Sequence, residues 1–155
     1  MVKKSVEKNA EYEVSLKVIL KNKKGQILLL KMPNTSSMAE YYDLLGGRIK
    51  ESEKVTSFRK IIKREIKEEV GSKIKYTLSE IPVAIGHHTY FSKIDKKEKY
   101  IFWVVFEATY QSGNVKISKE HSQYRWVNVT KNNLQNYFTR GPLEVMKHHL
   151  SGRLK

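Results

Sequence analysis

The sequence contains no cysteine in its 155 residues. The missing thiols exclude a disulfide framework and cysteine nucleophiles, and they are typical of proteins of the reducing cytosol. There is also no run of 18 apolar residues and no apolar signal-peptide core near the start, so neither a membrane span nor export is expected. The sequence predicts a cytoplasmic protein of one domain, residues 1–155, with a flexible polar start over residues 1–10.

Acidic residues are scarce relative to basic ones. Sixteen aspartates and glutamates stand against thirty lysines and arginines, which gives a formal net charge of +14 at pH 7. Such an excess attracts polyanions, so nucleotides, RNA and anionic surfaces are candidate partners. A lysine-rich composition also keeps a small protein soluble without any such partner, and the charge alone does not separate the two interpretations.

The order of apolar patterns predicts an α+β domain with a mixed sheet and helices on both of its sides. Apolar stretches predict strands at residues 11–21, 26–31, 42–45, 74–89 and 100–110. The last stretch is almost wholly apolar and is therefore expected at the centre of the sheet, whereas the segment 74–89 is interrupted near Pro82. Two final helices are expected over 130–138 and 142–150, the second starting at Pro142.

The residues before Gly71 predict a helix with an unusual face. They are rich in helix formers, and Gly71 stands where a left-handed C-terminal cap is expected. At about 100° per residue, Phe58, Ile61 and Ile62 form an apolar stripe in the first half of the helix. The stripe continues into the second half with three acids at spacings of i, i+3 and i+4, namely Glu65, Glu68 and Glu69.

Acids at the edge of a core are costly, because they repel one another and lose their hydration. A divalent cation relieves both costs, and carboxylate oxygens are ligands for magnesium or manganese rather than zinc. The alternative is an acidic helix end that makes ordinary pairs four residues apart, such as Arg64 with Glu68. Spacing alone leaves both interpretations open.

At these residues the sequence resembles the Nudix hydrolase family, whose signature is G-x5-E-x7-R-E-U-x-E-E-x-G-U, with U a bulky aliphatic residue. Gly47 and Glu53 match the first part, and the unbroken stretch 64–71, REIKEEVG, matches the second. There are two departures. Ten residues rather than seven separate Glu53 from the arginine, so that counting back from Arg64 places Thr56 at the glutamate position, and Ser72 stands at the last aliphatic position.

The resemblance implies a Nudix-like α/β/α sandwich and a set of site residues. Metal ions would be held by Glu65, Glu68, Glu69 and the carbonyl of Gly47, which lies beside Gly46 at a tight Gly-Gly turn after the strand at 42–45. Arg64 would hold a carboxylate in place through a bidentate pair. In several members an acid from a late loop joins the metals or acts as general base, and Glu120 stands at the matching place, ahead of His121. Glu53 would position a metal-bound water, with its role left open by the insertion.

Substrate contacts are expected from Arg48, Tyr90 and His88. His87 and His88 are adjacent on a predicted strand and point to opposite faces, so they do not form a joint metal site. Tyr90 and Phe91 offer a stacking surface for a base, although aromatic residues at a strand end are more often part of a core.

Four further residues have a structural interpretation as well as a functional one. Trp103 is most simply a core residue. Glu107 interrupts the apolar strand and faces either solvent or the site, with solvent preferred. His148 and His149 are expected to be exposed on the last helix.

The sequence therefore predicts a magnesium-dependent hydrolase, with manganese as the alternative metal, acting on a nucleoside diphosphate linked to another group. A nucleoside triphosphate or a dinucleoside polyphosphate ranks first, since relatives that split diadenosine polyphosphates often carry a tyrosine where Tyr90 stands. An RNA 5′ end ranks second. A non-catalytic module that binds nucleotide or RNA on the same scaffold belongs to a different class, and a homodimer stays open because many relatives dimerise.

Overall fold

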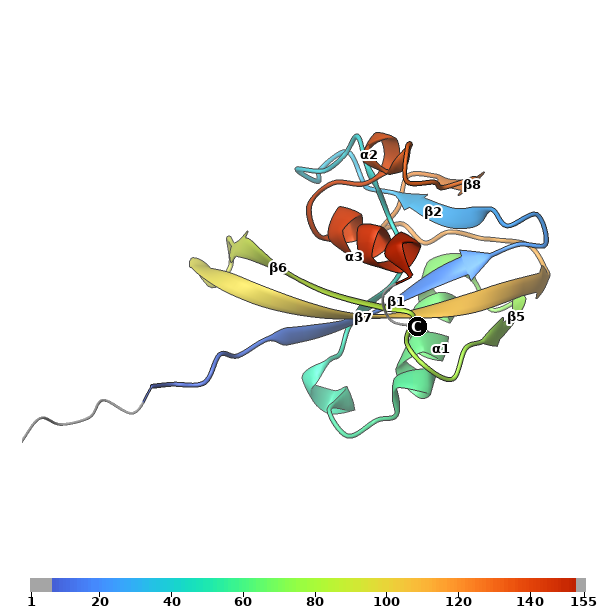
Figure 1. Cartoon of the computed structure of the whole chain (residues 1–155). Coiled ribbons are helices and arrows are strands. Elements are labelled where there is room, and N and C mark those ends of the chain that lie inside the picture. Colours follow the sequence, from blue (N-terminus) through green and yellow to red (C-terminus); the bar gives the residue numbers. More distant parts are fainter. Residues whose placement is uncertain (1–6, 153–155) are drawn as a thin grey trace, which may run out of the picture.

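The computed structural model describes residues 7–152 (Figure 1). The expected flexible start at 1–10 falls largely outside this range, and residues 7–10 carry no regular secondary structure. The strands in the described part are β1 (Glu13–Lys21), β2 (Ile27–Lys31), β3 (Tyr42–Asp43), β4 (Leu45–Arg48), β5 (Lys75–Leu78), β6 (Ala84–Ser92), β7 (Lys97–Ser112) and β8 (Tyr124–Val127). The helices are the 3-10 turn η1 (Glu51–Glu53), α1 (Phe58–Val70), α2 (Leu134–Tyr137) and α3 (Arg140–Ser151).

The sheet is mixed and is built around a parallel pair. β1 and β7 run in parallel over the whole of β1, from Glu13 opposite Ile101 to Lys21 opposite Thr109. All the other pairings are antiparallel: β4 and β2 add to β1, β5 and β6 add to β7, and β3 and β8 add to β2. β7 therefore lies at the centre of the sheet, as its continuous apolar sequence predicted.

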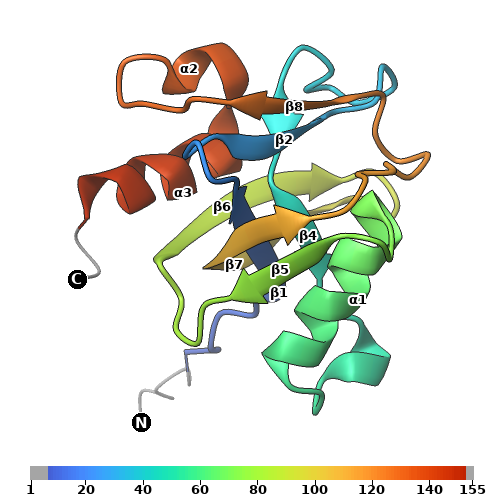
Figure 2. The same ribbon diagram turned by 90° about the vertical axis from the view of Figure 1, so that its right-hand side faces the viewer.

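Alternation along the strands separates two apolar cores. Leu16, Val18 and Leu20 of β1 face α1, together with Ile61 and Ile66 of that helix. The intervening position Ile19 joins the opposite core, where Trp103 and Val105 of β7 pack with residues of α2 and α3. Figure 2 shows the strands lying between α1 on one side and α3 on the other. The expected α/β/α sandwich with a mixed sheet is thus confirmed.

Two glycines allow α3 to lie directly on the sheet. A Cβ at Gly86 of β6 would stand 2.6 Å from Cγ1 of Val145, and a Cβ at Gly141 would stand 2.1 Å from the ring of Trp103. Because both glycines lack that atom, the helix packs against β6 and against the tryptophan without a gap.

Several element boundaries differ from the predicted ones. The expected helix at 130–138 shortens to α2, with Asn133 rather than Thr130 before it, and α3 begins at Arg140 rather than at Pro142. The segment 74–89 divides into β5 and β6 around Pro82, as expected. Gly71 ends α1 with φ 91° and ψ 164°, which is a positive φ outside the left-handed helical region. No helix within residues 7–152 has the length and apolarity that crossing a membrane requires.

The Gly-Gly pair lies inside strand β4 and not in a tight turn. Gly46 has a φ of +112° and pairs with Lys17 of β1. A Cβ at this position would stand 2.0 Å from the carbonyl oxygen of Leu16. Both the backbone angle and the close approach of β1 therefore require glycine here.

Substitution of Gly46 tests this requirement. Gly46→Ala should lower the free energy of unfolding by more than about 4 kcal/mol, because it adds a clash with the neighbouring strand to an unfavourable φ. Gly25→Ala is the matched control, since Gly25 has φ +75° with no atom within 4 Å of a Cβ, and it should cost only about 1–2 kcal/mol. Urea unfolding of the two variants measures the difference, and equal losses would contradict the proposed clash.

Candidate active site

Helix α1 presents its acids at the boundary between core and solvent. Glu65 and Glu69 are 8% and 6% exposed and lie among the buried residues of the helix. The side chain of Glu68 is 51% exposed and lies at the rim. The stripe read from the sequence is therefore present, with two carboxylates facing inward and the third at the opening.

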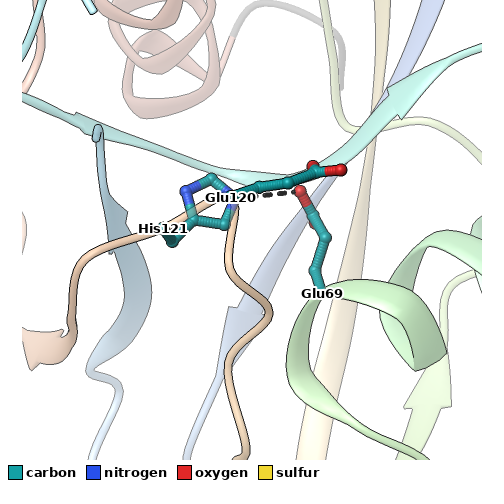
Figure 3. A group of neighbouring side chains, drawn as sticks. All are labelled: Glu69, Glu120 and His121. Carbon is teal, nitrogen blue, oxygen red and sulfur yellow. Dashed lines mark hydrogen bonds and ion pairs between the residues drawn. The ribbon is translucent and has the colours of Figure 1, made fainter. Parts of the chain in front are cut away.

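Glu69 is held from two sides. Its Oε2 accepts a hydrogen bond of 2.6 Å from the backbone N–H of Gly46, and its Oε1 lies 3.2 Å from Nε2 of His121 (Figure 3). Burial lowers the pKa of His121, but the hydrogen bond and charge of Glu69 outweigh it, so the net shift is upward. Nδ1 of the same ring lies 3.3 Å from the carbonyl of Lys31, so each ring nitrogen has an oxygen acceptor within reach when it carries a proton.

Glu65 lies directly against Gly47. A Cβ at Gly47 would stand 2.7 Å from Oε1 of Glu65, so the missing side chain is what admits the carboxylate. Burial raises the pKa of Glu65, and although Arg64 acts in the opposite direction, the charges of Glu69 and Glu68 raise it further. A cation near Glu65, in addition to Arg64, would stabilise the charged form of this carboxylate.

Arg64 joins three carboxylates. Its Nε and Nη2 lie 2.5 and 2.9 Å from the two oxygens of Glu53, which is a bidentate pair. The same guanidinium contacts Glu65 and Glu68, each at 2.7 Å. The expected pair with Glu68 is therefore present, but as one contact of a larger cluster.

The pairing of Glu53 with Arg64 also bears on which residue matches the glutamate of the motif. Residues 54–57 join η1 to α1, and Glu53 reaches Arg64 across this connection, whereas Thr56 is not among the partners of that guanidinium. Glu53 further accepts the backbone N–H of Lys50 at 3.0 Å. The carboxylate paired with Arg64 is thus that of Glu53, eleven residues before it in the sequence.

A late loop brings Glu120 to the same place. The backbone N–H groups of Lys116 and Ser118 donate to the carbonyls of Val70 and Glu69, at 3.0 and 2.9 Å, which fixes the loop on the end of α1. One ligand atom each of Glu69, Glu120 and His121 then lies within 4.8 Å of the others. The expected approach of Glu120 to the acids is therefore present, and the neighbouring His121 contacts Glu69.

These groups line a cleft of about 350 Å³. Its lining residues are Gly47, Arg48, Lys50, Arg64, Glu65, Glu68, Glu69, Ser118 and Glu120. Four of the lining residues are acids, Glu65, Glu68, Glu69 and Glu120, and carboxylate oxygens fit magnesium or manganese. Among the described residues, the ligand atoms that all lie within 4.8 Å of one another are those of Glu69, Glu120 and His121. Glu65 and Glu68 line the same cleft, which makes it a candidate divalent-metal site.

A second cavity, of about 500 Å³, meets the acidic cleft at Gly47 and Arg48. It lies on the α3 side of the sheet, and it brings together the three expected substrate residues Arg48, Tyr90 and His88. The guanidinium of Arg48 lies 4.7 Å from the centre of the Tyr90 ring, which is a cation–π contact. The acidic cleft and the aromatic pocket therefore adjoin at Gly47 and Arg48, which line both.

The structure corrects or extends the expectations for the aromatic residues. Phe91 is 65% exposed at this pocket and is not part of a core, whereas Tyr90 is partly buried against one. Trp103 is a core residue, as expected, and one face of it also lines the pocket. His87 lies away from His88, with its ring 6.5 Å from that of Tyr12.

Other candidate residues lie outside both cavities. Glu107 pairs with Lys21 at 2.7 Å and lies 3.8 Å from His149. Its side chain is 32% exposed and lines neither cavity, so it lies partly in solvent and outside the site. His148 and His149 are half-buried rather than exposed, and Nδ1 of His148 lies 2.8 Å from the carbonyl oxygen of Ile85.

Lys17 is a site residue that sequence reasoning missed. Its ammonium group is buried between the two cavities, where it donates to Asp43 at 2.7 Å and to the carbonyl of Gly46 at 3.0 Å. Burial lowers the pKa of this lysine, but Asp43, Glu69 and Glu65 raise it overall. A lysine inside the apolar run of β1 is the signal that could have identified it.

Comparison with known proteins places the chain in a family. The family model described as NUDIX domain matches residues 11–148. A sequence comparison with curated proteins gives no significant match. The chain therefore belongs to the NUDIX domain family. It is accordingly a pyrophosphohydrolase of the Nudix type.

Solved structures agree with this placement. The MutT protein of Methanosarcina mazei is 29% identical, with a TM-score of 0.58 over 78% of this chain and 80% of that one. A possible asymmetric diadenosine tetraphosphate hydrolase of Jonesia denitrificans gives 0.68 at 14% identity, over 93% and 96%. The dihydroneopterin triphosphate pyrophosphohydrolase of E. coli gives 0.61 at 15% identity, over 92% and 95%. The last two likenesses establish the fold alone.

Magnesium should stabilise the folded protein through the acids of α1. At a concentration of about 100 times its Kd, the metal adds roughly 2.7 kcal/mol and raises Tm by roughly 5–10 °C. Glu65→Gln should remove most of this shift while leaving the metal-free protein at least as stable, because a buried charge is neutralised. Thermal melts with magnesium or EDTA measure the shift, and Glu144→Gln on the exposed side of α3 is the control. A full shift in Glu65→Gln would exclude this metal site.

The assignment of Glu53 rather than Thr56 gives a second test. Glu53→Gln should weaken magnesium binding by about 10–100-fold, because Arg64 loses the charged fork that orients it. Thr56→Ala should leave the affinity unchanged. Calorimetric titration compares the two variants, and the reverse order would assign the motif position to Thr56.

Proposed function

We propose that the protein is a divalent-metal-dependent hydrolase that cleaves a nucleoside diphosphate linked to another group, with a nucleoside triphosphate or a dinucleoside polyphosphate as its substrate. The observation that carries this proposal is the junction of the two cavities at Gly47 and Arg48. A diphosphate at the junction would have the carboxylates of α1 on one side and an aromatic pocket for the nucleoside on the other. The solved structures named for diadenosine tetraphosphate and dihydroneopterin triphosphate support a substrate of this class.

The acids of the cleft divide into holding and supporting roles. Glu65, Glu68, Glu69 and the Gly47 carbonyl would hold magnesium or manganese, which supplies charge neutralisation of the diphosphate and a water of lowered pKa. Arg64 contacts Glu65 and Glu68 and orients both carboxylates. Its own guanidinium is held by Glu53.

Proton transfer and substrate placement fall to residues nearer the opening. Glu120 is exposed beside Glu69, where its carboxylate can accept a proton from the attacking water. Arg48 lies at the junction of the two cavities, where a guanidinium can bind the bridging phosphates. Tyr90 offers a ring on which a base can stack.

An RNA 5′ end is a second candidate substrate, favoured by one further observation. Phe91 exposes 65% of its surface at the mouth of the aromatic pocket, and it precedes a hairpin turn that contains Lys93 and Lys96. An exposed ring beside lysines suits the stacking and phosphate contacts of a following nucleotide. This arrangement, together with the charge of +14, would also serve a module that binds without cleaving.

Turnover of a nucleotide panel tests the proposal. The panel contains nucleoside triphosphates, diadenosine polyphosphates, ADP-ribose, nucleotide sugars and a 5′-triphosphate RNA, each with magnesium, and release of phosphate and pyrophosphate is measured. One class should be turned over, and Glu68→Gln should lower its turnover by at least about 100-fold without unfolding the chain, since a metal ligand is lost.

Glu144→Gln is the matched control, because Glu144 is an exposed glutamate on α3 that pairs with Lys147 away from both cavities. It should retain full activity. Unchanged turnover in Glu68→Gln would refute the role of the acids. Salt-sensitive RNA binding without magnesium-dependent turnover would identify a binding module instead.

A further inference from the structure

The charges of the aromatic pocket do not balance. Its lining contains three cationic side chains, Lys17, Arg48 and Arg140, and one acid, Asp43. Lys17 and Asp43 neutralise each other at 2.7 Å, and Arg48 lies 3.2 Å from Glu13 on the neighbouring strand. Arg140 is therefore the cation of the pocket that has no carboxylate partner among the described residues.

Arg140 is also held in an unusual backbone conformation. It is the first residue of α3 and has a φ of +49°, in the left-handed region that favours glycine. The next residue, Gly141, is fixed against the ring of Trp103. Because the close packing of Gly141 leaves little freedom, the strained angle at Arg140 places an arginine at the pocket where the local conformation alone would select glycine or asparagine.

The surroundings of Arg140 leave its charge uncompensated. The first turn of α3 contains no acidic residue. His88 lines the same pocket, and burial together with the charge of Arg140 lowers its pKa. A histidine that is neutral at pH 7 supplies a hydrogen bond beside the guanidinium without adding charge.

We propose that Arg140 binds a phosphate of the nucleotide whose base enters the aromatic pocket, so that the preferred substrates carry a phosphate beyond the two of the scissile linkage. This inference rests on the proposed function, because it places the scissile diphosphate at the junction with the acidic cleft. A guanidinium matches phosphate oxygens in a bidentate geometry. Dinucleoside polyphosphates and other nucleotides with a further phosphate fit this site. A nucleotide sugar whose sugar is neutral leaves the arginine without a partner.

Binding without metal tests the site separately from catalysis. In EDTA the acids of α1 repel phosphate, so a phosphate is bound by the pocket alone. AMP and adenosine are titrated into the 15N-labelled protein, and the amide signals of Gly141 and His88, which line the pocket, report on it. AMP should bind at least tenfold more tightly than adenosine and should shift these signals. Arg140→Gln should remove the advantage of AMP.

Two variants separate a binding role from a structural one. Arg140→Gly removes the guanidinium and relieves the left-handed angle, so it should lose the AMP preference while its melting temperature stays at or above that of the wild type. Lys24→Gln removes an equal charge from the exposed turn between β1 and β2, far from Arg140 in the sequence. It should leave the AMP preference unchanged. A lower melting temperature in Arg140→Gly with the preference intact would assign the residue a structural role and overturn the proposal.

Kinetics extend the test to the substrate that the panel identifies. For that nucleotide, Arg140→Gln should raise KM at least tenfold and change kcat less than twofold. An unchanged KM would overturn the proposal even with the hydrolase established. Loss of AMP binding in Arg140→Gln, from a protein that turns over no member of the panel, would support the anion site while the proposed hydrolysis fails.

Discussion

The structure depends on accommodating two buried acidic side chains at the edge of a packed core. Glu65 and Glu69 lie where α1 meets the sheet, and each loses most of its hydration there. Burial of this kind requires specific partners, and the fold supplies them from distant parts of the sequence. The N–H of Gly46 and the ring of His121 hold Glu69, while Arg64 holds Glu65. The same need explains why β4 carries two glycines, since any side chain there would displace either a strand or a carboxylate.

The sheet separates two kinds of chemistry. Oxygen donors gather on the α1 side, where the cleft suits a divalent cation. Cationic and aromatic groups gather on the α3 side, where the larger cavity suits a nucleotide. The two meet at Gly47 and Arg48 at the end of β4, and Lys17 lies buried between them with partners on both sides. A charge on one side is therefore felt on the other, which links metal binding to substrate binding through electrostatics.

The local part of this site could be predicted from the sequence, and the part made by tertiary contacts could not. The acids of α1 share one helix, so a 3.6-residue period was enough to place Glu65 and Glu69 on one face. The pairing of Glu53 with Arg64 depends on the path of a loop, and spacing therefore left Thr56 as an equal candidate. His121 and Arg140 reach the site only through contacts with residues far along the chain, and a one-dimensional pattern contains no signal for such contacts.

The central claim is that the carboxylates of α1 form a divalent-metal site, and its most direct test is a crystal structure of the protein with manganese, using anomalous scattering to locate the ion. The account predicts an anomalous peak in the cleft between Glu65, Glu68 and Glu69, with the carbonyl of Gly47 among the ligands. It further predicts that Glu53 keeps its two contacts to Arg64 when the metal is bound. A cleft without manganese at saturating concentration, or a peak held only by Glu120 and His121, would contradict the account.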